Sequence, residues 1–320
     1  MAGSTESMTS YYLGVDGGQS STTAVIGDAD GRIVGWASAG PCNHVGAAEG
    51  RAKFLRVMRE CLSQAAVRAG LSADKPQFHA ACLGMSGGPD DKKALLEELI
   101  AAGHLVVTND ARIALAGAMG GSPGAIVIAG TGSIAFGENA LGETARAGGW
   151  GYVFGDEGGA FDIVRQAVRA GLREFEGWGP RTALTPALLE AANCSNANEL
   201  LHALYTTEWP RSRTAGLAVL VDRIAEAGDP VALDIMHTAA DDLAALVGKV
   251  RPQLWREGEV PAVSWIGGVF QSAMLLKRFR AVVELEGIIA AAPRHSPAWG
   301  ALLIARKAAG LPPVPLYLRD

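Results

Sequence analysis

A carboxylate followed by glycines and hydroxyl side chains stands near the start of the chain, where an apolar run ends. The order is Asp16, Gly17, Gly18, Gln19 and Ser20. Glycines let backbone N–H groups come close to phosphate oxygens, and hydroxyl groups donate to the same oxygens. We therefore interpret the segment as a phosphate-binding hairpin, with Asp16 directed at the Mg²⁺ that accompanies nucleotide phosphates. A tight β-turn with Asp16 as a turn former explains the same residues equally well.

A second loop of this kind follows the apolar run 125–129. It consists of Gly130, Thr131, Gly132 and Ser133. Two such loops in one chain are more telling than one, because together they can hold a triphosphate from opposite sides. With Ala135, the loop also satisfies the dinucleotide fingerprint GxGxxG/A. That fingerprint must open a helix of several turns, whereas 136–151 is repeatedly interrupted by glycine and indicates strand and hairpin.

Another carboxylate, Asp110, follows the apolar run 105–107 and precedes the segment 112–119, which we expect to be helical. Transfer of a phosphoryl group to a sugar hydroxyl needs a base close to that hydroxyl, and an aspartate can serve because positioning matters more than a raised pKa. Asp110 is therefore a candidate general base. It could instead cap the helix, which Asp does well, and taken alone the motif favours capping.

The segment 148–159 combines an aromatic residue, Trp150, and an acidic pair, Asp156 and Glu157, with many glycines. Sugars are bound by such mixtures, because a carboxylate accepts hydrogen bonds from hydroxyl groups and an indole presents a flat apolar face. The alternative is that Trp150 fills the core and the acidic pair starts a helix. The two interpretations do not exclude each other.

A glycine pair, Gly267 and Gly268, follows the apolar run 263–266 and precedes a helical pattern near Ser272. Without side chains, the pair lets a flat purine approach the backbone. A plain strand-to-helix turn explains it equally well.

The composition excludes several classes of partner. The net charge of −5 comes from interleaved acidic and basic residues, so the sequence shows no cluster of basic residues that would bind nucleic acid or an anionic membrane. The four cysteines lie far apart, outside any zinc-binding spacing. We find neither a secretion signal nor the roughly 18 consecutive apolar residues of a membrane span. We therefore expect a cytoplasmic protein that acts on a small molecule.

Strand and helix patterns alternate along the chain, which is typical of an α/β fold. A strand is expected over 31–37 and a helix over 47–69, whose apolar positions keep helical spacing. The segment 158–250 is mostly helical by periodicity, with one helix starting at Asp229-Pro230. A last helix is expected over 297–309.

The order and content of these motifs resemble the N-acetylglucosamine kinases, which are grouped with the BadF/BadG/BcrA/BcrD-type ATPases in the actin-like superfamily. The resemblance runs from Tyr12 to about Arg306 and is weakest over 175–229. The Gly-Gly-Trp-Gly and Gly-Asp-Glu-Gly segments are its most specific part. One departure is visible, since family members usually have a third glycine and a threonine where this chain has Gln19 and Ser20.

The resemblance implies that the chain binds ATP with Mg²⁺ and phosphorylates the 6-hydroxyl of an amino sugar, with Asp110 as the base and Asp16 facing the metal. The residues implied for the nucleotide are Asp16, Gly17, Gly18, Ser20, Thr131, Gly132, Gly267, Gly268 and Ser272. Those implied for the sugar are Asn43, Asp110, Ser133, Gly149, Trp150 and Asp156.

The implied fold is two actin-like, ribonuclease H-like domains with mixed central sheets and an interdomain cleft that closes on the substrates. We expect the first domain over 1–117 with the C-terminal helix region 297–320, and the second over 118–296. We also expect a homodimer.

Two other functions remain open. The activases of the same superfamily carry a bridging iron–sulfur cluster, which needs closely placed cysteines, and no suitable pair stands out. A non-catalytic sugar-binding protein would need neither Asp16 nor Asp110. Among kinases, the acceptor could also be glucosamine, glucose or another hexose derivative.

Overall fold

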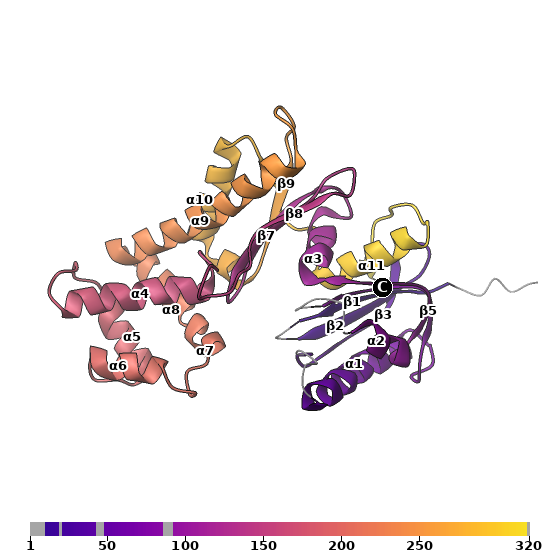
Figure 1. The fold of residues 1–320 in the computed structure, drawn as a ribbon, viewed down its shortest axis with the longest axis horizontal. Helices are drawn as coiled ribbons and strands as arrows, with labels where there is room; N and C mark the ends of the chain where they lie inside the picture. Colours follow the sequence, from indigo (N-terminus) through magenta and orange to yellow (C-terminus); the bar gives the residue numbers. More distant parts are fainter. Residues whose placement is uncertain (1–9, 19–20, 43–47, 86–91, 319–320) are drawn as a thin grey trace, which may run out of the picture. The chain divides into compact units, whose positions relative to one another are not determined.

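The computed structural model describes residues 10–18, 21–42, 48–85 and 92–318, which form two compact units (Figure 1). Unit 1 comprises Met1–Ser122 and Pro293–Asp320, and unit 2 comprises Pro123–Ala292. The expected boundaries at 117/118 and 296/297 lie within a few residues of these limits. Each unit contains one mixed sheet with helices, so the α/β class is confirmed.

The sheet of unit 1 has the strand order β11-β3-β2-β1-β4-β5. Its strands are β1 (Tyr12–Gly17), β2 (Thr22–Gly27), β3 (Arg32–Ala39), β4 (Gln77–Met85), β5 (Ala101–Asn109) and β11 (Tyr317–Leu318). Strands β1, β2 and β3 form an antiparallel meander, whereas β4 and β5 run parallel to β1. The parallel set matters for function, because its carboxyl ends meet at one edge of the sheet.

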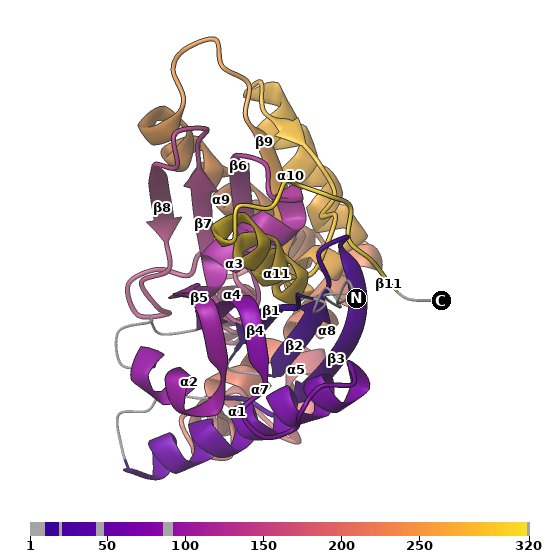
Figure 2. The same cartoon turned by 90° about the vertical axis from the view of Figure 1, so that its right-hand side faces the viewer.

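Helices cover both faces of this sheet (Figures 1 and 2). They are α1 (Ala48–Arg68), α2 (Lys93–Leu99), α3 (Asp110–Met119) and α11 (Pro297–Ala308). Neighbouring strand residues point to opposite faces, so Leu13 joins the core under α1 while Tyr12 joins the core under α11. The N-terminal segment and the C-terminal helix therefore belong to one folded unit.

Glycines allow α11 to lie directly on its neighbours. A Cβ atom on Gly14 of β1 would lie 2.3 Å from the backbone nitrogen of Leu302. A Cβ atom on Gly300 of α11 would lie 2.0 Å from the carbonyl oxygen of Ile113 in α3. Both separations are far below van der Waals contact, so these positions exclude any larger residue without movement of the backbone.

The sheet of unit 2 has the strand order β10-β9-β6-β7-β8. Its strands are β6 (Gly124–Ala129), β7 (Ser133–Glu138), β8 (Thr144–Gly148), β9 (Ala262–Ile266) and β10 (Ile289–Ala290). Strands β6, β7 and β8 form an antiparallel meander and β9 runs parallel to β6, which repeats the arrangement of unit 1. The loop 130–132 thus connects two antiparallel strands, and the dinucleotide-fingerprint alternative is excluded.

The remainder of unit 2 is helical. It comprises α4 (Ala160–Phe175), α5 (Leu184–Ala192), α6 (Ala197–Leu204), α7 (Arg211–Gly216), α8 (Ala218–Glu226), α9 (Pro230–Leu254), the 3₁₀ turn η1 (Gly268–Gln271) and α10 (Ala273–Leu285). Helix α9 begins as predicted, since the Asp229 carboxylate accepts hydrogen bonds from the N–H groups of Val231 and Ala232 at 3.0 and 2.9 Å. Within the described ranges, every helix is too short or too polar to cross a membrane.

Substitution Gly300→Ala tests the close packing of α11. The added methyl group meets the α3 backbone and forces the two helices apart, so we expect a loss of about 3 kcal/mol in the free energy of unfolding, measured by urea denaturation. Gly216→Ala is the matched control, because Gly216 is also helical and no atom lies within 4 Å of its Cβ position. Equal stability of the two variants would contradict this packing.

Candidate active site

Asp16 and Asp110 lie at the same edge of the unit 1 sheet. Asp16 pairs with Gly84 of β4, and Gly84 pairs with Thr108 of β5, two residues before Asp110. Adjacent strands are about 4.8 Å apart, so the backbones of β1 and β5 are separated by roughly 10 Å. Side chains that lean toward each other across that gap can share one ligand. The two carboxylates that we selected from distant motifs are therefore brought together.

Asn109, and not Asp110, is the N-cap of α3. Its side-chain oxygen accepts a hydrogen bond from the N–H group of Arg112 at 2.8 Å. Asp110 is the first helical residue, and its carboxylate accepts from the N–H group of Ala111 at 2.9 Å. The alternative in which Asp110 serves only as the helix cap is therefore wrong. The start of the helix places its carboxylate next to the backbone dipoles, where negative charge is favourable.

Asp16 carries the strongest electrostatic signature of the site. Burial and, as the smaller cause, the nearby charge of Asp110 together raise the pKa of its carboxyl group from 3.8 to about 6. Both causes disfavour the ionised form, and a divalent cation placed between the carboxylates would remove both. Mg²⁺ takes one or two carboxylates and completes its shell with water and phosphate oxygens. The pair therefore fits such an ion, although the described residues contain no cluster of three or more metal-ligating side chains.

The first glycine loop closes the β1–β2 hairpin. The N–H group of Gly18 donates to the carbonyl of Ser21 at 2.9 Å. A Cβ atom on Gly17 would lie 2.5 Å from the sulfur of Met85, so this glycine is closely packed. Ser20 and Asn43, predicted for the phosphates and the sugar, lie outside the described residues, as does Gln19.

The second glycine loop is the corresponding hairpin turn of unit 2. The carbonyl groups of Gly130 and Thr131 accept hydrogen bonds from the N–H groups of Ala160 and Phe161 at 2.8 and 3.1 Å, so the loop is attached to the start of α4. Among the described residues, no hydrogen bond uses the N–H groups of Thr131 and Gly132. Such adjacent donors are suited to an anion.

A cavity of about 530 Å³ lies beside this loop in unit 2. Its lining includes Gly130, Thr131, Gly268 and Ser272, which brings together residues from two of the predicted nucleotide motifs. The volume is in the range of small-molecule sites. Apolar side chains of α4, α7, α8 and α9 form most of the remaining wall.

The glycine pair beside the cavity has two different roles. Gly267 has φ 119°, and a Cβ atom there would lie 2.1 Å from the carbonyl oxygen of Ala129. Gly268 has no atom within 4 Å of its Cβ position, so it leaves open space at the cavity wall. Ser272 caps α10 and donates to Asp222 at 2.6 Å, which makes it part of the wall's framework.

Ser133, Gly149 and Asp156, which we predicted for the sugar, lie together at the start of β7 in unit 2. The N–H group of Gly149 donates to the carbonyl of Ser133 at 3.0 Å, and the N–H group of Ser133 donates to the Asp156 carboxylate at 3.3 Å. Trp150 is 66% exposed, with the Arg146 guanidinium 4.5 Å from its ring centroid. The alternative in which Trp150 fills the core is therefore wrong. Asp156 does not start a helix either, because α4 begins at Ala160.

Sequence reasoning missed Arg211, whose guanidinium forms an ion pair with Asp156. Arg211 belongs to the helical segment in which the family resemblance is weakest. No local spacing relates the two residues, so no signal in the chain could have paired them.

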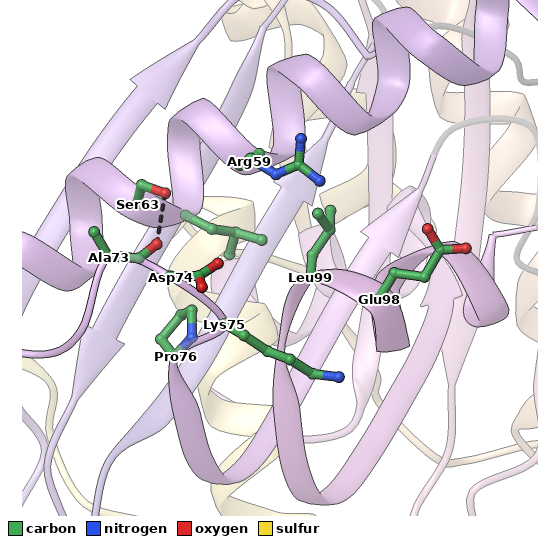
Figure 3. Close-up of a pocket in the computed structure, with 9 residues that line it drawn as sticks. Arg59, Ser63, Ala73, Asp74, Lys75, Pro76, Glu98 and Leu99 are labelled. Atoms are coloured by element: carbon green, nitrogen blue, oxygen red, sulfur yellow. Dashed lines mark hydrogen bonds between the residues drawn. The ribbon is translucent and has the colours of Figure 1, made fainter.

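A small recess in unit 1 is not a substrate site. It has a volume of about 40 Å³ and is lined by residues such as Arg59, Lys75 and Glu98 (Figure 3). Figure 3 also shows the hydrogen bond from the Ser63 hydroxyl to the carbonyl of Ala73, 2.8 Å long. Such a volume holds a few water molecules and no hexose.

Comparison with known proteins identifies relatives over almost the whole chain. Residues 13–305 match the BadF/BadG/BcrA/BcrD ATPase family. The chain is 31% identical to the N-acetylmuramic acid/N-acetylglucosamine kinase of Clostridium acetobutylicum over 92% of this chain and 98% of that protein. It is 29% identical to the N-acetyl-D-glucosamine kinase of Dictyostelium discoideum over 82% of this chain and 87% of that protein. The crystal structure of a proposed N-acetylglucosamine kinase from Chromobacterium violaceum has a TM-score of 0.75 and 28% identity, covering 93% of this chain and 99% of that one.

Substitution Asp16→Asn tests the raised pKa. Because the carboxyl group of the folded protein binds its proton more tightly than that of the unfolded chain, its contribution to stability is complete below about pH 4 and is lost as the pH rises to about 6. We expect the variant to be more stable than the wild type by about 2–3 kcal/mol at pH 8 and to lose that advantage near pH 4. Urea denaturation without Mg²⁺ at the two pH values measures it.

Asp30→Asn is the matched control for this experiment, since Asp30 is exposed. Its stability should differ little from the wild type at both pH values. A variant Asp16→Asn that is less stable than the wild type at pH 8 would show that the ionised carboxylate is well compensated in the folded protein.

Proposed function

The chain belongs to the BadF/BadG/BcrA/BcrD ATPase family, and we propose that it is an ATP-dependent kinase that phosphorylates the 6-hydroxyl of N-acetylglucosamine or a related amino sugar. The observation that supports this proposal most strongly is the unit 2 cavity, where Gly130 and Thr131 of the second glycine loop line the same space as Gly268. The loop would bind the phosphates through its N–H groups, and the purine would lie against Gly268. This assignment gives the second glycine loop and the Gly267–Gly268 pair a role at the same nucleotide site.

The carboxylates of unit 1 would supply the remaining chemistry. Asp110 would accept the proton of the sugar hydroxyl as that oxygen attacks the γ-phosphorus, and ADP would leave. Asp16 would hold Mg²⁺, which neutralises charge on the phosphate oxygens when it is bound. The raised pKa of Asp16 supports this role, because a carboxylate that is unfavourable alone gains most from a cation.

The named relatives support an N-acetylated amino sugar as the acceptor. Within this chain, Ser133, Gly149 and Asp156 form one hydrogen-bonded cluster, in which the Ser133 hydroxyl donates to the carbonyl of Glu157 at 2.6 Å. The exposed Trp150 follows Gly149 in the sequence. Asp156 would accept hydrogen bonds from sugar hydroxyls. Glucosamine and other hexoses remain alternative acceptors, and an activity assay over a panel of sugars distinguishes among them.

We further propose that the kinase is cytoplasmic and a homodimer.

The alternative function, that of an activase with a bridging iron–sulfur cluster, is less well supported than the kinase because most of the cysteines are buried. Cys42, Cys61 and Cys82 are buried. Burial raises the pKa of Cys61 to about 11 and that of Cys82 to about 12. A cluster that bridges two subunits needs thiolates at their interface, and of the four cysteines only Cys194 is partly exposed. Buried protonated thiols in the core of unit 1 are better explained as packing residues.

Substitution Asp110→Asn tests the base. Removal of the proton acceptor should lower kcat with N-acetylglucosamine by about 10²- to 10⁴-fold, while the affinity for ATP stays within a few-fold of the wild type. A coupled ADP-release assay over a panel of amino sugars and hexoses measures turnover, and calorimetry measures nucleotide binding. Asp30→Asn serves as the control that keeps wild-type turnover. Substantial residual activity of Asp110→Asn would remove Asp110 from the mechanism.

Substitution Gly268→Phe tests the purine site. Because no atom lies within 4 Å of the Gly268 Cβ position and this residue lines the cavity, the new ring would occupy part of the space that we assign to the purine. We expect the KM for ATP to rise by roughly tenfold or more, with the KM for the sugar and the melting temperature nearly unchanged. An unchanged KM for ATP would place the purine elsewhere.

A further inference from the structure

Arg211, the first residue of α7, pairs with a carboxylate 55 positions earlier in the chain. Its Nη2 atom donates to Oδ2 of Asp156, and the other oxygen, Oδ1, accepts from the N–H group of Ser133 at 3.3 Å. Asp156 is only 6% exposed. The buried carboxylate therefore links the helical part of unit 2 to the first residue of β7.

The same carboxylate lies directly against the second glycine loop. A Cβ atom on Gly132 would lie 2.3 Å from Oδ2 of Asp156, so the space that a side chain would occupy is filled by the carboxylate. The start of α4 attaches the loop on another side, through the carbonyl groups of Gly130 and Thr131. The position of the loop therefore depends on the position of the Asp156 carboxylate.

The arrangement costs stability in two ways. Asp156 has φ 67°, in the left-handed region that non-glycine residues rarely adopt. The Nε atom of Arg211 is buried and has no hydrogen-bond partner among the described residues. Such unfavourable features gather at functional sites, where geometry matters more than stability. A role in packing alone would not need a charged pair here, because apolar residues of similar volume do as well or better.

Aromatic rings hold the guanidinium in place. The Cζ atom of Arg211 lies 5.0 Å from the ring centroid of Tyr152 and 5.7 Å from that of Phe161. Arg211 also lines a second cavity of unit 2, with a volume of about 580 Å³. The guanidinium is thus oriented by the rings and remains within reach of small solutes.

We propose that Arg211 is a positioning residue for phosphoryl transfer: it holds the Asp156 carboxylate, which holds the Gly130–Ser133 loop in the conformation that binds phosphate. This inference rests on the proposed function. Arginine suits the task because its guanidinium stays charged at every physiological pH and donates in a fixed plane. Without it, a buried carboxylate loses its counter-ion and the loop loses the support on that side.

Substitution Arg211→Ala should lower kcat/KM for ATP by roughly 10- to 100-fold and should weaken the binding of Mg²⁺·ADP, measured by calorimetry on the full-length protein. Arg213→Ala is the matched control. Arg213 lies on the same helix and stacks on Trp209 at 4.0 Å, but it donates to the carbonyl of Glu208 instead of to Asp156. The control should bind Mg²⁺·ADP like the wild type, which separates loss of the Asp156 contact from loss of an arginine–aromatic contact.

Two further measurements separate positioning from folding. If Arg211 acts through Asp156, the double variant Arg211→Ala with Asp156→Asn should bind Mg²⁺·ADP no more weakly than Asp156→Asn alone. Guanidinium ion at millimolar concentration should restore at least part of the activity of Arg211→Ala by entering through the second cavity. Arg211→Lys keeps the charge without the planar group and should lose less than Arg211→Ala, which provides a readout should the alanine variant fold poorly.

Additive losses in the double variant, or an affinity of Arg211→Ala for Mg²⁺·ADP equal to that of Arg213→Ala, would overturn the inference. A wild-type protein that binds Mg²⁺·ADP but phosphorylates no sugar would defeat the proposed acceptor chemistry instead. In that case the nucleotide affinities still decide on Arg211, because they do not depend on the acceptor.

Discussion

The parallel pairing of β1, β4 and β5 is the constraint on which the candidate site of unit 1 depends. It places Asp16 and the start of α3 at one sheet edge, where two carboxylates oppose each other in partly buried surroundings. Burial and, to a smaller extent, the proximity of Asp110 raise the pKa of Asp16, and the pair creates a place where a cation is favourable. The close contacts of Gly14 and Gly300 keep α11 and α3 against the sheet, so the same packing that stabilises the unit also maintains the unfavourable pair.

Unit 2 also contains a buried carboxylate, but its surroundings differ from those of Asp16. Its buried carboxylate, Asp156, has a guanidinium partner from α7 and a backbone donor from Ser133. The negative charge of Asp156 is therefore compensated by the protein itself, whereas in unit 1 burial and the charge of Asp110 disfavour the ionised form of Asp16. This difference agrees with the roles that we propose: Asp16 would bind a metal ion, whereas Asp156 keeps its protein partners and would accept a hydrogen bond from a sugar hydroxyl in addition, because a carboxylate has about four acceptor sites.

The two sheets repeat one topology, in which a meander of three antiparallel strands is joined by a parallel strand beside the first. In each, the first hairpin turn contains glycines and follows a buried strand. The resemblance between the Asp16–Ser20 and Gly130–Ser133 motifs thus reflects equivalent positions in two similar sheets. In unit 2, the backbone of this turn is held between the β6–β7 ladder and the start of α4.

The sequence by itself determined the local features: where strands end, which turns contain glycine, and where Asp229-Pro230 begins a helix. These depend on neighbours within a few positions, and the order of the motifs was enough to indicate the family. The tertiary structure alone decided that Trp150 is exposed and that Arg211 is the partner of Asp156. The choice of Asn109 instead of Asp110 as the cap of α3 is local, since its bond reaches only three positions along the chain. Strand β4, which lies between β1 and β5, was not predicted, although the separation of Asp16 and Asp110 depends on it. Partners separated by 55 or more positions are chosen by the packing of helices and the order of strands, and a pattern that extends over one or two turns of chain contains no information on either.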